Sequence, residues 1–340
     1  HMTDYYRPLA QSGACPPSGY ALAGGWGGFN EVEVLRRGAA SEFVSAQDLP
    51  AKVLAALTEP RADIADLQFD APNIMGILNV TPDSFSDGGR NEDVVVASKS
   101  AQAMVEAGAD ILDIGGESTR PGAARVPDAQ EIGRTAPVIR ALTTAGLNVP
   151  ISIDTRKSAV AAAALDAGAT LVNDVSGFTF DTALAPLCAE RETPVCVMHA
   201  QGDPATMQQD PHYDDVLLDV FDFLASRIIA LTDAGIPKSQ IIADPGIGFG
   251  KTRDHNLRLL QNISLFHGLG VPILLGASRK RFIGTISGVA QADARVAGSL
   301  AVALAAIAQG VQIVRVHDVA ETAQALRLWS ACTKGQISNG

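Results

Sequence analysis

Cysteine is scarce in this 340-residue sequence, and long apolar runs and an excess of positive charge are missing altogether. The four cysteines, Cys15, Cys188, Cys196 and Cys332, form no CxxC pair and no zinc-ligand spacing, so we interpret them as buried or inactive thiols in a reducing compartment. No run is apolar and long enough to be a membrane span or a signal peptide, which predicts a cytoplasmic protein without a membrane partner. The net charge of −11 argues against a nucleic-acid partner, because such proteins need a basic face.

Two common catalytic motifs are missing as well. No HxH pair occurs and the six histidines are scattered, which disfavours a metal-hydrolase site. The segment PGIGFGKT at 245–252 is not a phosphate-binding P-loop, because Pro245 stands where that motif requires glycine. We interpret its glycines as a loop that needs positive φ angles or close backbone approach to a ligand. His199, after a short apolar run, is interpreted as a packed histidine rather than a ligand.

A regular pattern begins at residue 74. Short, β-rich apolar runs are each followed by an Ala-rich helical stretch, and the runs end about every 34 residues, the length of one βα unit. The predicted strands are 74–80, 111–115, 150–154, 170–174, 194–198, 241–244, 271–276 and 312–316. The main predicted helices are 92–107, 128–145, 157–167, 214–234, 292–309 and 319–329.

This pattern predicts an α/β fold, a (β/α)8 TIM barrel with an N-terminal extension. Near-continuous apolar strands are buried on both faces, which indicates a parallel sheet. About eight βα units in this length fit a closed barrel. An open doubly wound sheet is the alternative, but it usually has a glycine-rich phosphate turn after its first strand, and the segment IMGILNVTPDSF has none.

The chain divides into four predicted parts. Residues 1–20 are rich in Pro, Gly and small polar residues and are expected to form a flexible arm. Residues 21–72 are expected to pack on the barrel as an extension, with strands near 31–35 and 41–46 and a short helix near 52–58. The barrel itself is expected at 73–331, and a C-terminal tail at 332–340.

Polar groups end nearly every predicted barrel strand. Because active sites of such barrels lie at the carboxyl ends of the strands, these groups are expected to meet. The strand ends carry Asn79, GGESTRPG at 115–122, Asp154, Asn173, Met198, Asp244, GASRKR at 276–281, and Arg315 with His317. A single polar strand end commonly caps a helix, but so many together favour a concave polar site.

Two kinds of group stand out among these strand ends. Amides and carboxylates supply the donors and acceptors that a flat, amino-substituted heterocycle needs; they are Asn79, Asp154, Asn173 and Asp244. Positive charge and hydroxyl donors suit an anion such as phosphate; they come from Ser278, Arg279, Lys280, Arg315 and His317. The residues therefore indicate a heterocyclic ligand that carries a phosphate group.

Seven segments in this order resemble dihydropteroate synthase across about residues 73–331. They are IMGILNVTPDSFSDGG, DIGGESTRPGA, SIDTRK, NDVSG, DPGIGFGK, GASRKRFIG and RVHDV. The resemblance implies a (β/α)8 barrel that joins 6-hydroxymethyl-7,8-dihydropterin diphosphate to p-aminobenzoate, giving 7,8-dihydropteroate and diphosphate for folate biosynthesis. It also implies that sulfonamides compete with p-aminobenzoate. The loop at 118–122 has the ordinary family form, so ordinary sulfonamide sensitivity is expected.

The resemblance also implies roles for individual residues. Those implied to bind the pterin are Asp154, Asn173, Met198, Asp244, Lys280 and Arg315. Those implied to bind the diphosphate are Asn79, Arg315 and His317, with Asn79 also facing the implied cofactor, Mg2+. Those implied to form the p-aminobenzoate pocket are Thr119, Arg120, Phe249, Ser278 and Lys280. Asp154, Lys280 and Arg315 are implied to be catalytic, and the loops 80–90 and 115–124 to close over both substrates.

Two other functions compete with this interpretation. A methyltetrahydrofolate-dependent methyltransferase would share the acidic pterin contacts but would need no diphosphate site, which SRK at 278–280 and RVH at 315–317 argue against. A non-catalytic scaffold on the same fold would have lost loop or charged residues, and none is missing. The resemblance implies a homodimer, for which the Ala-rich helix expected at 295–309 is a candidate surface.

Overall fold

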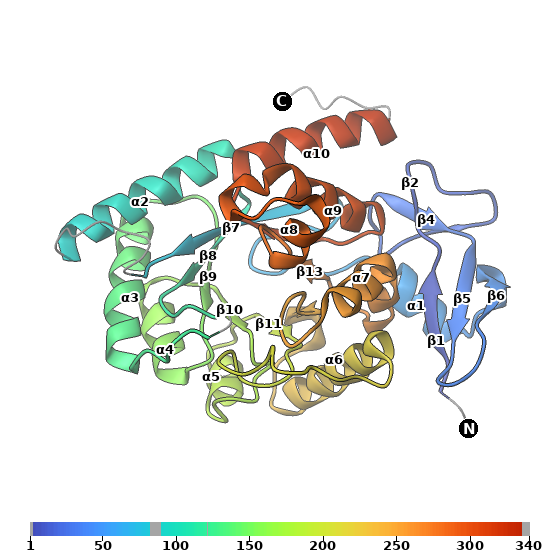
Figure 1. Ribbon diagram of the computed structural model, residues 1–340, viewed down its shortest axis with the longest axis horizontal. Coiled ribbons are helices and arrows are strands. Elements are labelled where there is room, and N and C mark those ends of the chain that lie inside the picture. Colours follow the sequence, from blue (N-terminus) through green and yellow to red (C-terminus); the bar gives the residue numbers. More distant parts are fainter. Residues whose placement is uncertain (1–2, 82–89, 121, 335–340) are drawn as a thin grey trace.

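Eight parallel strands form the barrel that the sequence pattern predicts (Figure 1). The structure is a computed structural model that describes residues 3–81, 90–120 and 122–334. The strands are β7 (Asn73–Asn79), β8 (Ile111–Gly115), β9 (Ile151–Asp154), β10 (Leu171–Asp174), β11 (Val195–Met198), β12 (Ile241–Asp244), β13 (Leu274–Leu275) and β14 (Ile313–Val316). Their order is β12-β11-β10-β9-β8-β7-β14-β13, and a single bridge between Ala243 and Ile273 joins the two end strands.

Helices surround the barrel between successive strands (Figure 1). They are α2 (Arg90–Ala107), α3 (Asp128–Thr144), α4 (Ser158–Ala167), α5 (Leu184–Glu190), α6 (Val216–Asp233), α7 (Arg253–Gln261), α8 (Arg281–Ser287), α9 (Val296–Ala308) and α10 (Val319–Lys334), with 3-10 turns η3 (Lys238–Gln240), η4 (Ile263–Leu269) and η5 (Ala292–Ala294). The stretch predicted as one helix at 292–309 is thus divided, and α10 continues into the predicted tail. No helix in the described ranges has the length and apolar character to cross a membrane.

The N-terminal extension forms a small subdomain beside the barrel, drawn in blue at the right of Figure 1. Its elements are β1 (Tyr5–Pro8), β2 (Gln11–Ser12), β3 (Tyr20–Ala21), β4 (Gly27–Phe29), β5 (Glu31–Leu35), β6 (Glu42–Ser45), η1 (Ala46–Asp48) and α1 (Ala51–Thr58). They make two three-stranded sheets, β1-β5-β6 and β2-β4-β3. A separate apolar core, which includes Phe29, Val32 and Leu57, holds the sheets and α1 together.

The expectation of a flexible arm at 1–20 is wrong for the residues that the structure describes. Tyr5–Pro8 pair with Val32–Leu35 as antiparallel strands. The Tyr5 ring is buried edge-on against Phe221 of α6, and its hydroxyl donates to Asp222 at 2.8 Å. These contacts are long-range, so the Pro- and Gly-rich composition of the segment could not show them.

The extension packs on one flank of the barrel through further direct contacts. The Trp26 indole donates to the Ile307 carbonyl at the end of α9 over 2.8 Å, and the Ser264 hydroxyl of η4 donates to the Pro8 carbonyl over 2.9 Å. Arg37 forms an ion pair with Asp219 of α6 at 2.6 Å. The contacts reach different elements, so the subdomain is fixed at several points rather than tethered at one.

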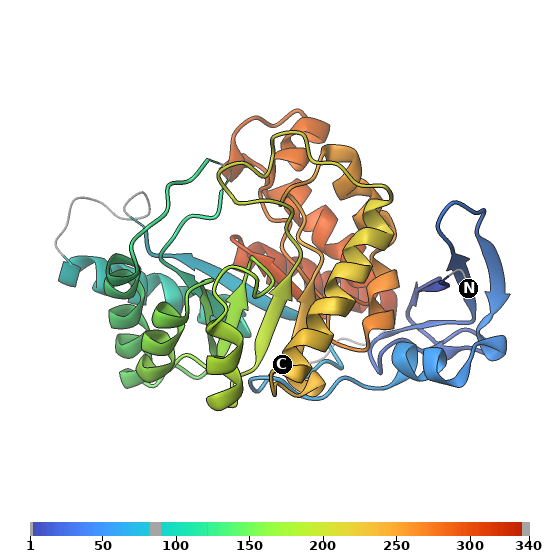
Figure 2. The ribbon, with the colours of Figure 1, turned by 90° about the horizontal axis from the view of Figure 1, so that it is seen from below.

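The segment between α1 and β7 closes the amino-terminal end of the barrel. It runs beneath the barrel in Figure 2, on the side opposite the loops that follow the strands. Ile64, Leu67 and Phe69 are buried there against one inward-facing residue from each of seven strands. Those residues are Met75, Ile111, Leu171, Cys196, Ile242, Leu274 and Ile313. This apolar floor leaves the opposite end of the barrel as the place for a polar site.

Candidate active site

The polar site begins one layer above the apolar floor. Side chains of a strand alternate between its two faces, so the residue two positions after a floor residue also points into the barrel. On most of these strands that next inward residue is polar. The resulting layer contains Asp113, Asn173, Met198, Asp244 and Arg315, and Asp154 joins it from β9, two positions after the buried Ser152. The structure therefore brings together, at one end of the barrel, five of the six residues predicted to bind the pterin, and the sixth, Lys280, follows β13.

Arg315 is the centre of this layer. Its Nε donates to Oδ2 of Asp113 at 2.7 Å, and its Nη2 donates to Oδ2 of Asp154 at 3.2 Å. The Asn173 amide also donates to Oδ2 of Asp113, at 3.1 Å. The other carboxylate oxygen of Asp113, Oδ1, is buried and has no hydrogen-bond partner among the described residues. It is a free acceptor for an N–H group of a flat ligand.

Asp113 is a residue of the candidate site that the sequence did not predict. It lies in the middle of β8 and is 0% exposed, so it does not stand at a strand end. The signal was present in the segment ILDIG, because an acid two positions after an inward-facing Ile111 must also face the barrel interior. A prediction made only from strand-end residues does not include Asp113.

Burial shifts the pKa of Asp154 away from its ordinary value. Removal from water, together with the nearby Asp113 carboxylate, raises the pKa of Asp154 to about 8, although Arg315 opposes the shift. In the free protein this carboxyl is therefore poorly stabilised as an anion. Arg315 already lies 3.2 Å from this carboxyl and satisfies only part of its demand for positive charge, so a cation that developed beside Asp154 would be attracted to the same acidic pair.

The raised pKa of Asp154 predicts a pH-dependent difference in stability. The folded protein holds a proton that the unfolded chain releases near pH 4, so wild-type stability should fall as the pH rises through the folded pKa of about 8. Asp154→Asn lacks this linkage. Relative to the variant, wild type should lose more than about 1.4 kcal/mol of unfolding free energy between about pH 5 and about pH 8.

Urea titrations of both proteins across this pH range measure the difference. Asp166→Asn is a matched control, because Asp166 is exposed on α4 and pairs with the exposed Arg191. The control should keep a constant offset from wild type. A constant offset for Asp154→Asn as well would show that Asp154 does not carry the proton.

Lys280 lies beside the acidic layer, after β13. Its ammonium donates to the Ile247 carbonyl and lies 4.7 Å from the centroid of the Phe249 ring. Burial lowers the pKa of Lys280 to about 8, although Asp244 favours its charged form. Burial likewise raises the pKa of Asp244, against the effect of Lys280. Lys280, Phe249 and Asp244 are thus neighbours at the mouth of the barrel.

The glycine-rich loop after β12 is held against the loop after β11 by a buried lysine. Lys251 donates to the carbonyls of Gly246 at 2.7 Å and Phe249 at 3.0 Å, and its Nζ lies 2.8 Å from Nδ1 of His199. Gly246 and Gly250 have positive φ angles, and a Cβ at Gly246 would lie 1.8 Å from the His199 carbonyl oxygen. Close backbone packing therefore explains the glycines, and His199 is a packed residue.

Ser278 and His317 meet on the other side of Arg315. The Ser278 hydroxyl accepts the His317 backbone N–H at 3.1 Å and lies 2.9 Å from its Nδ1. Burial and the nearby Arg279 and Arg315 cations lower the pKa of His317 to about 4, so at neutral pH it offers a hydrogen bond and no charge. Arg279, grouped with the anion-binding residues from sequence, instead pairs with Asp318 at 2.5 Å. The anion half of the site therefore depends on Arg315 and Lys280 for charge.

The remaining predicted residues lie on loops at the same end of the barrel. Thr119 is half-buried and Arg120 is exposed, and the Arg120 charge contributes to the lowered pKa of His317. Asn79 ends β7 and is half-buried. Most of the predicted closing loop 80–90 lies outside the described residues, which resume at Arg90.

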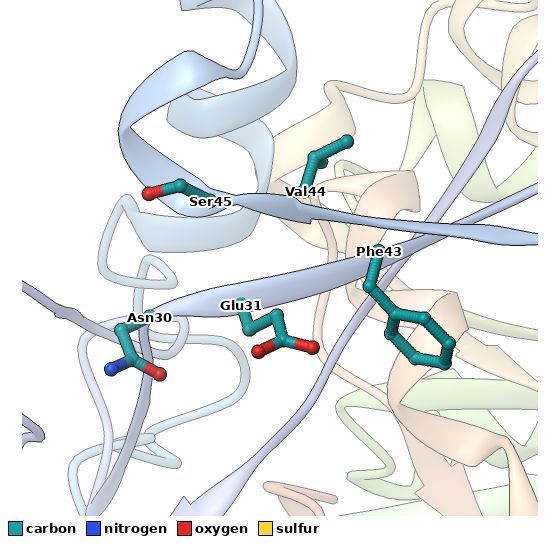
Figure 3. A pocket seen from close by; sticks show the side chains of 5 residues that line it. All are labelled: Asn30, Glu31, Phe43, Val44 and Ser45. Atoms are coloured by element: carbon teal, nitrogen blue, oxygen red, sulfur yellow. The ribbon is translucent and has the colours of Figure 1, made fainter.

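Of two cavities in the described part of the structure, one adjoins this mouth and the other lies on the N-terminal extension. One of about 230 Å³ has Phe249 in its wall and is otherwise lined by the loops after β9, β10 and β11, including Arg156, Phe180 and Met207. The other, of about 280 Å³, lies on the N-terminal extension along β5 and β6 (Figure 3). Its side chains contain no predicted site residue, so only the first cavity adjoins the candidate site.

Comparisons with known proteins agree with this geometry. The model of the family described as "Pterin binding enzyme" matches residues 75–317. A dihydropteroate synthase of Escherichia coli (strain K12) is 46% identical over 265 residues, which is 78% of this chain and 93% of the relative. The Xanthomonas albilineans dihydropteroate synthase with 4-aminobenzoic acid has a TM-score of 0.75 and 46% identity, covering 81% of this chain and 98% of that one. The Yersinia pestis dihydropteroate synthase with a sulfonamide drug has a TM-score of 0.74 and 45% identity, covering 78% and 96%. The chain therefore belongs to the pterin binding enzyme family and, within it, to the dihydropteroate synthases, which are transferases.

Proposed function

We propose that the protein joins 6-hydroxymethyl-7,8-dihydropterin diphosphate to p-aminobenzoate, giving 7,8-dihydropteroate and diphosphate. The observation that supports this most directly is the position of Arg315, which bridges Asp113 and Asp154 at the bottom of the mouth. One guanidinium there serves both halves of the site, since it orders the acids that would hold a ring and supplies charge for an anion above them. We extend to this chain the p-aminobenzoate and sulfonamide binding of the solved relatives.

The acidic layer is proposed to bind the pterin. Carboxylates and amides match the edge of an aminopterin, whose ring nitrogens and amino group alternate as donors and acceptors. The free Oδ1 of Asp113 adds one acceptor to this set. Asn173, Asp244 and Lys280 supply the others, and Met198 provides an apolar surface for the ring. The direction of the Asp113 and Asp154 side chains is fixed by Arg315, so the cradle is ordered before the ligand binds.

The diphosphate is proposed to lie between Arg315, His317 and Asn79. Mg2+ commonly binds through one or two protein oxygens plus substrate phosphates. No cluster of three or more acidic, histidine or cysteine side chains that could hold a metal occurs in the described part of this chain. Asn79, half-buried at the end of β7, is the residue that would hold such an ion through its amide oxygen, together with the substrate. When bound, the ion would neutralise charge on the leaving group.

The p-aminobenzoate is proposed to bind above the pterin, next to Lys280 and Phe249. Ser278 and the loop residues Thr119 and Arg120 would complete this pocket. An ammonium over an aromatic ring, as in Lys280 over Phe249, gives a surface that accepts both a benzoate ring and its carboxylate. A sulfonamide would compete there.

The chemistry is proposed to be a dissociative substitution. The bond between the methylene carbon and the diphosphate oxygen breaks, and its electron pair leaves with the diphosphate, held by Arg315. The positive charge that remains on the pterin lies beside Asp154, whose raised pKa marks a position that favours a cation. The aniline nitrogen then forms the new C–N bond and loses a proton. No nucleophile from the protein is required.

A diphosphate-release assay tests this function. With dihydropterin diphosphate, Mg2+ and p-aminobenzoate, the protein should release diphosphate and form dihydropteroate in equal amounts. Without p-aminobenzoate, sustained release should fall by about 100-fold or more, because no acceptor traps the cation. A chelator should remove activity, and added Mg2+ should restore it. Methyl transfer from a methylated folate, with no diphosphate release, would instead support the methyltransferase alternative.

Two properties of the whole protein belong to the same proposal. We propose that it acts in the cytoplasm, since its cysteines are all free and two of them are buried. We also propose a homodimer. On α9 the residues Ala297, Ala301 and Ala305 are exposed at helical spacing, which leaves a small-residue face that a second helix could approach closely.

A further inference from the structure

The loop that carries Thr119 and Arg120 is closed at its base. After β8 the chain leaves the barrel at Gly116 and returns to α3 near Pro127. Where the two ends pass each other, Oε2 of Glu117 accepts the backbone N–H of Val126 at 2.7 Å. The described residues between them, 118–120 and 122–125, therefore belong to a loop whose two ends are joined at its base.

One buried lysine holds both ends of this loop. Lys157 is only 2% exposed, and its ammonium donates to Oε2 of Glu117 at 2.9 Å and to the Val126 carbonyl at 2.5 Å. Its third hydrogen bond goes to Oε2 of Glu131 in α3, at 2.7 Å. All three N–H bonds of the ammonium are thus used, two of them on the loop and one on the helix behind it.

The charges around Lys157 are balanced. Glu117 lies 3.4 Å from Nε of Arg156, so in the buried part of this group two carboxylates, Glu117 and Glu131, face two cations. Burial tends to raise the pKa of Glu117, but the hydrogen bonds from Lys157 and Val126 outweigh it, and the net shift is downward. Buried ion pairs usually add little stability over apolar residues of the same size. Such a group in this position therefore indicates a role in placing the loop.

The same residues connect the loop to Asp154. Lys157 lies three residues after Asp154, and the intervening Thr155 donates to Oε1 of Glu131 at 3.0 Å. Arg156 packs 4.1 Å from the centroid of the Phe180 ring and pairs with Asp203 at 3.3 Å. Four consecutive residues thus have different contacts. Asp154 belongs to the candidate site, Thr155 bonds to α3, Arg156 contacts the loops after β10 and β11, and Lys157 holds the base of the loop after β8.

We infer that Lys157 and Glu117 are positioning residues that hold the loop 118–125 in a fixed relation to Asp154 and thereby set the affinity for the second substrate. This rests on the proposed function, in which Thr119 and Arg120 contact p-aminobenzoate. A loop released from its base samples many more conformations, and binding must then order it again. In the proposed function the pterin would contact mainly side chains of the strands below the loop, so its affinity should depend much less on the position of the loop.

A charge-neutral double variant tests the inference. Lys157→Met with Glu131→Gln removes one cation and one anion, so Glu117 keeps Arg156 as its partner. The KM for p-aminobenzoate should rise about 10-fold or more, the effect of about 1.4 kcal/mol of lost binding. The dissociation constant for dihydropterin diphosphate, measured without p-aminobenzoate, should stay within about two-fold of wild type. The matched control is Lys99→Met with Glu106→Gln, the same exchange at two exposed positions of α2.

Glu117→Gln is the second variant, and it decides the matter if the double variant does not fold. It keeps an oxygen for the Val126 N–H but loses the charge that Lys157 binds. It should raise the KM for p-aminobenzoate in the same selective way. An unchanged KM, or a parallel loss of affinity for both substrates, would overturn the inference. Absence of dihydropteroate formation by wild type would instead overturn the proposed function, so the two failures are distinct.

Discussion

Replacing Asp154 with asparagine should lower kcat by about 100-fold or more, the usual scale for losing a preorganised charge at a reacting centre. The asparagine keeps the size of the side chain and an oxygen for a hydrogen bond, but it cannot attract the cation that forms on the pterin. Binding of the dihydropterin diphosphate should be largely retained. Arg315 would still be held by Asp113 through its 2.7 Å hydrogen bond, so the cradle keeps its order.

Steady-state kinetics with both substrates, together with calorimetric binding of the pterin, separate these two effects. Asp166→Asn again provides the control for the same chemical change on the surface. The variant should be slower and yet, at about pH 8, more stable than wild type, because it no longer buries a carboxylate with a raised pKa. Near-normal kcat in Asp154→Asn would remove Asp154 from the mechanism.

Phe69→Ala should lower the free energy of unfolding by about 3–5 kcal/mol, the range for truncating a buried phenylalanine. Phe69 is 3% exposed and fills the barrel floor with Ile64 and Leu67. The seven strands that meet there cannot move inward to fill the space, because their spacing is set by the hydrogen bonds of the barrel.

Phe43→Ala is the matched control, since Phe43 belongs to the extension but is 58% exposed. It should change stability by less than about 0.5 kcal/mol. Guanidinium titrations of the two variants measure the contrast. Similar small losses for both would mean that the floor contributes little to the fold.

The barrel could be predicted from sequence because its strands are short apolar runs at regular spacing. Most observed strands begin or end within a residue of the predicted ones, since both faces of each strand are buried. Strand β13 is the exception, with two residues instead of six. Pro272 lacks a backbone N–H, and the barrel is joined at Ile273 by a single bridge, so this part of the sheet is weakly paired.

The site could be predicted only in part, and the reasons differ between residues. Asp154, Asn173 and Asp244 end their strands, where polar residues attract attention. Asp113 lies inside a strand, and its role depends on which face of the strand turns inward. The role of Lys157 was beyond sequence reasoning, because its partners Glu117 and Glu131 come together only through the packing of α3 on the barrel.

Because Ile64, Leu67 and Phe69 fill the amino-terminal end of the barrel, the described residues leave the carboxyl-terminal end as the entrance to the candidate site. A ligand that binds against the acidic layer and Arg315 must therefore enter before a second ligand binds above it. A molecule resting nearer the rim also blocks the way out for one that lies deeper. The order in which the two substrates arrive and the joined product departs is thus constrained by the three apolar side chains that close the far end.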